Sequence, residues 1–272
     1  MIANAMRTKW AAGKPIINGW LSVASPFTAE IMAEQGYDSL TIDLQHGLVG
    51  YEAATGMLQA MRASNVTPMV RVPWLDPADI MKSLDAGAYG VICPMINTAE
   101  EAARLVSYMR YPPNGQRSFG PTRVSISSGA DYGQHADKEV VALAMIETAE
   151  AYANIDAIVA TKGLDGVYIG PADLTLGLTG RKYPTGFDRE EPEIVAAIKK
   201  ILERAHKAGI RAGIHTGTPA YAAKAIGWGF DLVTLSNDVR LLANAAQASV
   251  ASVRKLLGET PAPATPGAAK GY

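Results

Sequence analysis

In this 272-residue chain, several side chains that can do chemistry stand at the ends of short apolar runs. Asp43 ends the run LTID, His46 follows three residues later, and Arg71 ends the run PMVR. Farther along, Glu147 follows ALAMI and Asp173 follows GVYIGPA. Carboxylates suit a divalent metal, an arginine suits an anion, and a histidine suits proton transfer near neutral pH.

The apolar runs are strand-like and helical segments separate them, which predicts alternating strands and helices along the whole chain. Eight such pairs favour a closed (β/α)8 barrel, whose active site lies at the carboxyl ends of the strands. No GxGxxG follows the first strand, which counts against a dinucleotide-binding fold. The predicted strands lie near 16–23, 38–44, 67–72, 89–95, 141–147, 164–169, 211–215 and 230–235. The predicted helices lie near 26–35, 51–64, 77–86, 98–109, 148–161, 193–208, 218–227 and 237–257.

A helix–glycine–strand phrase recurs as EQGYDSLTID, DAGAYGVICP, TKGLDGVYIG and GWGFDLVTLS. Each glycine is placed to end a helix, where a positive φ is cheap for this residue. Two Gly- and Pro-containing segments are expected to be loops, 110–138 with a short helix at most and 175–192 at the catalytic face.

Composition narrows the class of protein. The chain has a net charge of −1 and is 48% hydrophobic, so it has material for a large core and no long-range charge for nucleic acid or an anionic membrane. Its single cysteine, Cys93 in VICPM, is interpreted as a buried core residue. No signal peptide or membrane-length apolar run is found, so we expect a cytoplasmic protein with one domain, 1–257, and a flexible Ala/Pro/Gly-rich tail, 258–272.

Glu147 and Asp173 are the candidate metal ligands. They follow the fifth and sixth predicted strands, so they can converge, and two carboxylates with waters or substrate oxygens suit Mg²⁺, Mn²⁺ or Co²⁺. Taken singly, Glu147 could instead cap a helix or form a salt bridge at the rim. In GPADL, Gly170 admits close approach of a ligand, and the amides near Ala172 and Asp173 can bind a carboxylate or enolate oxygen.

Four further residues are weighed for a role at the same face. We expect His46 to transfer protons and Arg71 to hold an anion rather than a rim carboxylate. Asp85 lies at a helix C-terminus, where an acid is electrostatically unfavourable, which hints at a partner such as a histidine of a neighbouring unit. For His215, at the end of the seventh strand, a role in the site and a role in packing both stay open.

Together these segments resemble the HpcH/HpaI aldolase family, the metal-dependent class II pyruvate aldolases of the phosphoenolpyruvate/pyruvate barrel superfamily. The resemblance covers about residues 7–256. It rests on the order and spacing of IDLQHG, RVPWLDPADIMKSLDAGAYGVICPM, RYPPNGQRSFGP, MIET and GVYIGPADL.

This resemblance implies a divalent metal on Glu147 and Asp173 and a 2-oxo acid bound through its carboxylate and keto oxygens. It implies that Arg71 steadies the developing enolate, that His46 paired with Asp85 does acid/base work, and that Asp43 lies in the shell around the metal waters. The amides from Gly170 to Asp173 would bind the carboxylate. The resemblance also implies a homohexamer in which the C-terminal helix packs on a neighbouring subunit.

The expected reaction is the reversible cleavage of a 4-hydroxy-2-oxo acid to pyruvate, or hydroxypyruvate, and an aldehyde. With its two arginines, the segment QRSFGPTR resembles the hydroxy-ketoacid aldolase branch of the family more than the 4-hydroxy-2-oxoheptanedioate aldolase branch. Alternatives are a citrate-lyase or malyl-CoA type lyase of the same superfamily, and a carboxylate-binding barrel without turnover. The physiological aldehyde, the metal and the stereochemistry are left open by the sequence.

Overall fold

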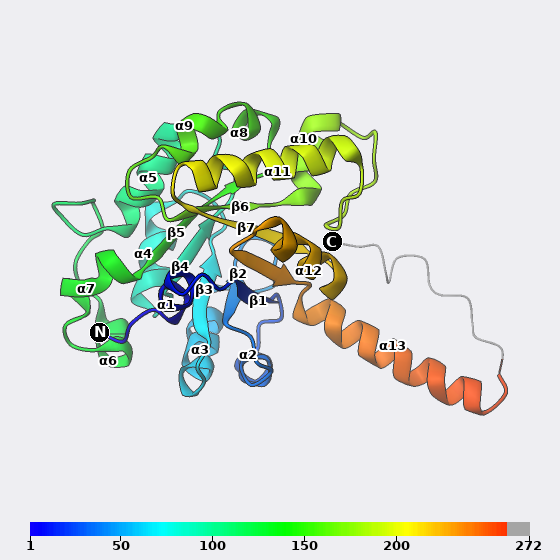
Figure 1. Cartoon of the computed structure of the whole chain (residues 1–272). Helices are drawn as coiled ribbons and strands as arrows, with labels where there is room; N and C mark the ends of the chain where they lie inside the picture. Colours follow the sequence, from blue (N-terminus) through cyan, green and yellow to red (C-terminus); the bar gives the residue numbers. More distant parts are fainter. Residues whose placement is uncertain (260–272) are drawn as a thin grey trace.

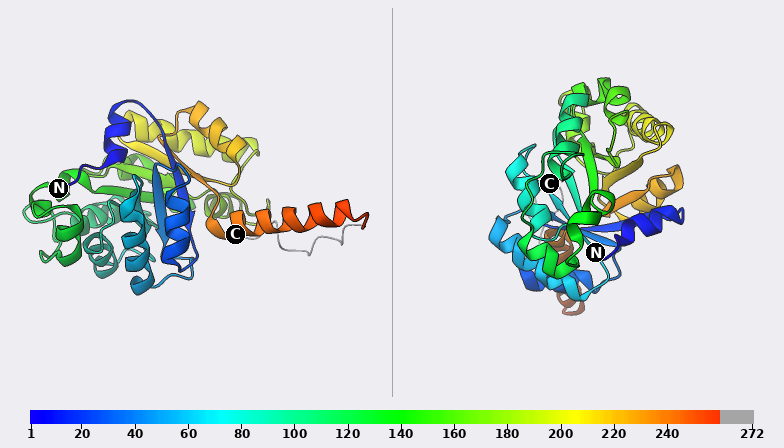
Figure 2. Two further views of the ribbon diagram at one scale, coloured as in Figure 1. Left: turned by 90° about the horizontal axis from the view of Figure 1, so that it is seen from below. Right: turned by 90° about the vertical axis from the view of Figure 1, so that its left-hand side faces the viewer.

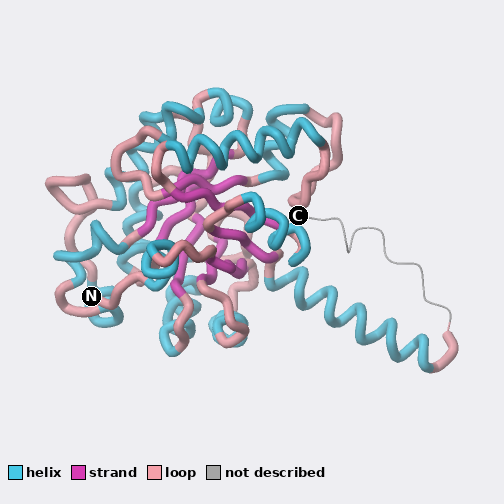
Figure 3. The backbone as a smooth tube through the Cα atoms, viewed as in Figure 1, coloured by secondary structure: helices cyan, strands magenta, loops and turns pink. Residues whose placement is uncertain are grey.

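Eight parallel strands close into a barrel in sequential order, as expected for a (β/α)8 fold. The computed structural model describes residues 1–259, and Figure 3 shows the strands at its centre. Each strand pairs in register with the next, and β8 closes onto β1. The strands are Ile16–Leu21 (β1), Ser39–Asp43 (β2), Thr67–Arg71 (β3), Gly90–Cys93 (β4), Val141–Ile146 (β5), Gly166–Ile169 (β6), Arg211–Thr216 (β7) and Leu232–Leu235 (β8).

Helices surround the barrel, except for α13, which projects away from it (Figures 1 and 2). Several begin at capping side chains; Asp76, for example, accepts the amide hydrogens of Ala78 and Asp79 ahead of Pro77. The helices are Ala5–Ala11 (α1), Pro26–Ala33 (α2), Tyr51–Ala60 (α3), Met61–Ala63 (η1), Pro77–Asp85 (α4), Ala99–Met109 (α5), Thr122–Ser128 (α6), Tyr132–Glu139 (α7), Ala149–Ala153 (α8), Ile155–Val159 (α9), Pro171–Thr179 (α10), Pro192–Lys207 (α11), Pro219–Trp228 (α12) and Asp238–Leu256 (α13).

The hydrophobic core has two layers, because the strands are buried on both faces. One layer fills the inside of the barrel with side chains such as Trp20, Met69 and Tyr168. The other lies between the strands and the helices and includes Cys93, which is fully buried as expected from the sequence. Burial raises the pKa of the Cys93 thiol, so this side chain is an inert part of the core.

The recurring helix–glycine–strand phrase closes the amino-terminal end of the barrel. Its glycines adopt positive φ, as predicted. In three of its four copies an aspartate follows, and its carboxylate accepts the amide hydrogen of a residue at the start of the preceding strand in the barrel. The pairs are Asp38 with Ile17 at 2.8 Å, Asp165 with Ala142 at 2.8 Å and Asp231 with Ala212 at 2.9 Å.

Helix α1, which the sequence did not predict, is held against this end of the barrel by the same aspartates. Arg7 binds Asp165 at 2.6 Å and Lys9 binds Asp38 at 2.5 Å. Trp10 donates its indole N–H to the backbone carbonyl of Asp231. The barrel is therefore closed opposite its catalytic face, and ligands must enter at the carboxyl ends of the strands.

Other predicted boundaries were partly wrong. Segment 110–138, expected as a loop with a short helix at most, contains both α6 and α7, and the loop expected at 175–192 begins only at 180 because α10 runs to Thr179. Helix α6 (TRVSISS) is rich in Ser and β-branched residues with weak helix propensity, so burial of Val124 with the α7 residues Tyr132 and Ala136 decides its structure. The helix predicted at 148–161 is divided into α8 and α9 at Asn154.

Helix α13 carries exposed apolar residues along its length. From residue 241 to 256 every side chain is exposed, and Leu242, Val250 and Val253 are among them.

No helix among residues 1–259 combines the length and apolar character needed to cross a membrane. The predicted division into a domain, 1–257, and a tail, 258–272, stays a prediction, since residues 260–272 lie outside the described part of the chain.

Candidate active site

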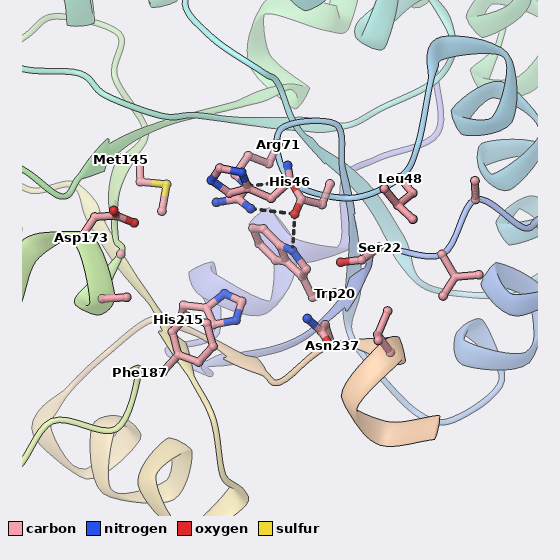
Figure 4. A pocket seen from close by; sticks show the side chains of 16 residues that line it. Trp20, Ser22, His46, Leu48, Arg71, Met145, Asp173, Phe187, His215 and Asn237 are labelled. Atoms are coloured by element: carbon pink, nitrogen blue, oxygen red, sulfur yellow. Dashed lines mark hydrogen bonds and ion pairs between the residues drawn. The ribbon is translucent and has the colours of Figure 1, made fainter. Parts of the chain in front are cut away.

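A cavity of about 440 Å³ opens at the carboxyl ends of the barrel strands. Figure 4 shows residues of β1, β2, β3, β5, β7 and α10 converging on it. Its lining includes the predicted residues Asp43, His46, Arg71, Gly170, Ala172 and Asp173, together with Trp20, Ser22, Val23, Ala24, Leu48, Met145, Phe187, His215, Asn237 and Val239. No lysine is among these described lining residues.

Asp43 and Arg71 form a paired contact at one wall of the cavity. They are register partners on β2 and β3. Arg71 donates from Nε to Oδ1 at 2.8 Å and from Nη2 to Oδ2 at 2.6 Å, and its guanidinium lies 4.8 Å from the ring centre of Trp20. Burial alone would raise the pKa of Asp43, but the hydrogen bonds and charge of Arg71 outweigh it and lower that pKa. The site therefore holds a fixed, ionised pair at its wall.

The loop after β2 places His46 at the rim of the same cavity. Asp43 Oδ1 accepts the backbone amide hydrogens of Gln45 at 3.1 Å and of His46 at 3.3 Å, so one carboxylate orients both Arg71 and this loop. The His46 side chain is exposed and lines the cavity. Solvent exposure together with a position facing the cavity suits a residue that exchanges protons with a bound substrate.

Glu147 lies buried behind the cavity wall, directly after β5. Its Oε1 accepts the amide hydrogen of Met95 at 2.8 Å, and Met95 adopts a positive φ of 55°, uncommon for a residue with a side chain. Burial raises the pKa of Glu147 to about 7; the Met95 hydrogen bond opposes this, and the nearby Asp173 charge adds to it. The Glu147 carboxylate therefore holds the backbone of Met95 in a sparsely populated conformation.

Asp173 stands in the first turn of α10. Gly170 is the N-cap and Pro171 the first helical residue, so the amides of Ala172 and Asp173 have no partner inside the helix. A Cβ on Gly170 would lie 2.8 Å from Glu147 Oε2 and 2.6 Å from Met145 Cε, so only glycine admits this approach. GPADL is therefore a helix N-terminus, which can bind an anion, and not a simple turn.

The residues present fit a divalent metal. The negative charge of Asp173 raises the pKa of the buried Glu147 carboxyl group. A bound cation would offset this repulsion between the two carboxylates. Both are oxygen donors, the type that Mg²⁺ and Mn²⁺ prefer. No group of three or more His, Cys, Asp or Glu side chains able to hold a metal exists among residues 1–259, so these two carboxylates would need waters or substrate oxygens as further ligands.

Asp85 does not reach His46 within the chain. It ends α4, close to the start of β4, and so lies at the amino-terminal end of the barrel, whereas His46 lies at the opposite end. Its carboxylate accepts from Arg117 Nη2 at 2.5 Å. Within one chain, Asp85 and His46 therefore lie at opposite ends of the barrel, and the expected pairing of the two residues stays a prediction.

Several lining residues were not found from the sequence. Trp20 donates its indole N–H to Asp43 Oδ2 at 3.2 Å, and Phe187 comes from the long loop after α10. His215, left open between site and core, contacts both rings, with centroid distances of 4.9 Å to Trp20 and 4.3 Å to Phe187. The alternation of β1 carries a signal for Trp20, because positions 18 and 20 both point into the barrel, but no local pattern marks Phe187.

Known proteins resemble this chain over nearly its whole length. Residues 17–245 match the sequence model of the HpcH/HpaI aldolase/citrate lyase family. A hydroxypyruvate/pyruvate aldolase of Rhizorhabdus wittichii is 46% identical over 253 residues, covering 93% of this chain and 100% of that protein. A 4-hydroxy-2-oxo-heptane-1,7-dioate aldolase of Salmonella dublin is 35% identical over 253 residues, covering 91% and 94%. A crystal structure of an HpcH/HpaI aldolase/citrate lyase family protein from Burkholderia cenocepacia superposes with a TM-score of 0.84 at 31% identity, covering 92% and 99%.

Proposed function

Because the chain belongs to the HpcH/HpaI aldolase/citrate lyase family, we propose that it reversibly cleaves 4-hydroxy-2-oxo acids to pyruvate, or hydroxypyruvate, and an aldehyde. The resemblance drawn from the sequence is confirmed, and the chain is an aldolase-type carbon–carbon lyase, an aldehyde-lyase. One observation carries the assignment of substrate: Asp173, Arg71 and the N-terminus of α10 line one cavity, and the Glu147 carboxylate lies directly behind its wall at Gly170.

The substrate is positioned by groups of complementary charge. The carboxylate of the 2-oxo acid would accept from the amides of Ala172 and Asp173 in the first turn of α10, where the helix dipole favours an anion. Arg71, held by Asp43, would donate to the keto oxygen, where negative charge develops. A divalent cation held by Glu147 and Asp173 supplies Lewis-acid stabilisation of that developing charge.

In the cleavage direction, His46 takes the proton of the C4 hydroxyl group. The C3–C4 bond then breaks, its electron pair passes to C3 and the keto oxygen, and C4 leaves as the aldehyde. His46 returns the proton to C3 and completes the 2-oxo acid, so atoms and charge balance. Condensation runs through the same steps in reverse.

The metal is proposed as Mg²⁺, Mn²⁺ or Co²⁺, since a site of carboxylates and exchangeable oxygens accepts all three. The test is pyruvate release from a racemic 4-hydroxy-2-oxo acid by protein treated with EDTA and then supplied with each ion. Activity that disappears with EDTA and returns with metal is expected. Pyruvate release that persists in EDTA, or no release with any ion from folded protein, would contradict the proposal.

Assembly into a homohexamer is part of the same proposal, and α13 supports it. Val239, Leu242, Val250 and Val253 recur at spacings of three or more residues that place them along one side of this exposed helix. The double variant Leu242→Asp/Val253→Asp should lower the mass measured by light scattering, whereas Asn244→Asp, about half a turn away, should not. Wild-type protein of monomeric mass would contradict the assembly.

Assembly would also allow His46 to pair with Asp85. Since Asp85 lies at the opposite end of its own barrel, a His46–Asp85 pair can form only between chains. Mixing inactive His46→Asn and Asp85→Asn proteins, after dissociation and reassembly, should then recover part of the activity. Failure to recover any activity in confirmed mixed oligomers would remove Asp85 from the site.

A cytoplasmic location completes the proposal, supported by the single buried cysteine, which needs no oxidising compartment.

A further inference from the structure

His215 is a buried, titratable side chain of the cavity that the proposed reaction does not use. It lies at the carboxyl end of β7, is 7% exposed and packs between Trp20 and Phe187 (Figure 4). Burial lowers the pKa of His215 to about 3, and the positive charge of Arg71 contributes. The imidazole is therefore neutral under working conditions and carries one proton on its two ring nitrogens.

A buried hydrogen-bond network decides which nitrogen carries that proton. The Tyr168 hydroxyl donates its single proton to Thr234 Oγ1 at 2.7 Å, and its oxygen lies 3.1 Å from His215 Nδ1. With the phenol proton on the Thr234 side, Nδ1 is the donor to the phenol oxygen and Nε2 keeps its lone pair.

The far end of the network holds this arrangement in place. Asn18 donates from Nδ2 to Thr234 Oγ1 at 2.9 Å, and its Oδ1 accepts from Ser39 at 2.7 Å and Thr41 at 3.1 Å. All of these side chains are fully buried inside the barrel. The amide of Asn18 thus has a single orientation, and the chain of hydrogen bonds fixes His215 from below.

We infer that Nε2 of His215 accepts a hydrogen bond from a hydroxyl group of the bound substrate. Among the described residues, Nε2 makes no hydrogen bond, while its ring lines the cavity. A neutral acceptor flanked by aromatic rings does not attract the substrate carboxylate, which the α10 amides would hold, but it does suit an uncharged O–H group. Asn237, also in the lining, uses its Oδ1 to cap α13.

This inference rests on the proposed aldolase function and sharpens it. The hydroxyl group has two possible sources, C3 of hydroxypyruvate or the α-carbon of a hydroxyaldehyde, and the two are separated by a set of four reactions. Pyruvate and hydroxypyruvate are each paired with propanal and with glycolaldehyde, and kcat/KM is measured for every pair. A site built to bind a hydroxyl group disfavours the analogue that lacks it, because its acceptor is left unpaired.

The expected result is selective. His215→Phe should lower kcat/KM about tenfold for one hydroxylated compound, hydroxypyruvate or glycolaldehyde, relative to the analogue without the hydroxyl group, with the reaction of pyruvate with propanal little changed. His215→Gln, whose amide oxygen can accept a hydrogen bond, should recover part of the ratio. Tyr168→Phe should weaken the same ratio, because either ring nitrogen can then carry the proton. His135→Phe, an exposed histidine of α7, is the control and should change no ratio.

Equal loss in all four reactions would show that His215 only supports packing and would overturn the inference, as would ratios identical to wild type. Calorimetric titration of hydroxypyruvate and pyruvate, and of glycolaldehyde and propanal, gives a second readout that needs no turnover. A chain that turns over none of the four pairs with any metal contradicts the aldolase proposal. Each hydroxylated compound and its analogue still give a ratio of dissociation constants. Comparing that ratio between His215→Phe and wild type would decide the role of His215.

Discussion

The two oxygens of Asp43 hold Arg71 by two separate hydrogen bonds, at 2.8 and 2.6 Å, across neighbouring strands of the barrel. Trp20 donates to the same carboxylate and lies against the guanidinium. An arginine fixed at two points presents its remaining edge in one orientation, which is what a catalyst needs where charge develops. Asp43 is thereby a positioning residue for both Arg71 and the His46 loop.

Replacing Asp43 with Asn should disturb the orientation of Arg71 while leaving the other side chains of the site in place. The amide keeps one acceptor, but its NH₂ group faces an N–H of Arg71 instead of an oxygen, so the guanidinium loses its fixed orientation. We expect kcat/KM to fall about 100-fold for every 2-oxo acid tested, a loss of the size seen when an oxyanion donor is removed. Steady-state kinetics with Asp76→Asn as the matched control, which keeps its capping role on α4, checks this; a loss restricted to one aldehyde would show that Arg71 reads the acceptor instead.

Replacing Glu147 with Gln should remove most of the affinity for a divalent metal, because a neutral amide is a poor ligand for a hard cation. Titration of Mn²⁺ followed by calorimetry or electron paramagnetic resonance would measure the change. Glu150→Gln, an exposed acid three residues later on α8, is the control and should bind metal as wild type does. Unchanged Mn²⁺ affinity in Glu147→Gln would remove this residue from the metal site.

The same variant should alter stability with pH in a defined direction. The pKa of Glu147 is raised to about 7, above the value of 4.5 for an unperturbed glutamate, so its protonated form is favoured by folding. Its contribution to stability is complete at low pH and is lost as the pH rises through about 7. In EDTA, wild type should therefore lose more thermal stability between pH 6 and pH 8.5 than Glu147→Gln; parallel profiles would contradict the raised pKa.

His215 should act in the opposite sense, on the acid side. Its folded pKa of about 3 lies below the ordinary 6.5, so the neutral form is favoured by folding. The contribution is fully present above pH 6.5 and is lost progressively as the pH falls toward 3. Urea unfolding at pH 7 and pH 4.5 should show a larger fall in the free energy of unfolding for wild type than for His215→Phe. An equal fall in both proteins would mean that protonation of His215 is accommodated in the folded state.

Asp165 should be a strong determinant of stability at the closed end of the barrel. It binds Arg7 at 2.6 Å and Arg110 at 2.9 Å and accepts the Ala142 amide hydrogen. Asp165→Ala leaves the buried guanidinium of Arg110 without its carboxylate, which should cost about 3 kcal/mol in urea unfolding. Asp156→Ala breaks a more exposed pair with Arg204 at 3.3 Å and should cost less than about 1 kcal/mol. Similar losses in both variants would contradict the special role of Asp165.

The candidate site residues could be found from the sequence because barrel geometry makes position along a strand informative. Any polar residue that follows a buried parallel strand lies at the catalytic face, so Asp43, Arg71, Glu147 and Asp173 could be placed without coordinates. The recurring glycine of each helix–strand connection likewise identified the repeat, because a positive φ leaves few other residue types.

Tertiary structure alone decided what depends on contacts between distant segments. His215 owes its neutral state to burial and its orientation to Tyr168 and Thr234 on the neighbouring strands, and Phe187 reaches it from a loop. Asp85 could be identified as a candidate from its unfavourable position at a helix end, but only the path of α4 shows that it points away from the cavity of its own chain. The sequence by itself determined the order of strands and helices and the chemical groups at their ends, because both follow from local periodicity. The structure decided which of those groups face one another, because burial, register and packing are properties of the closed barrel.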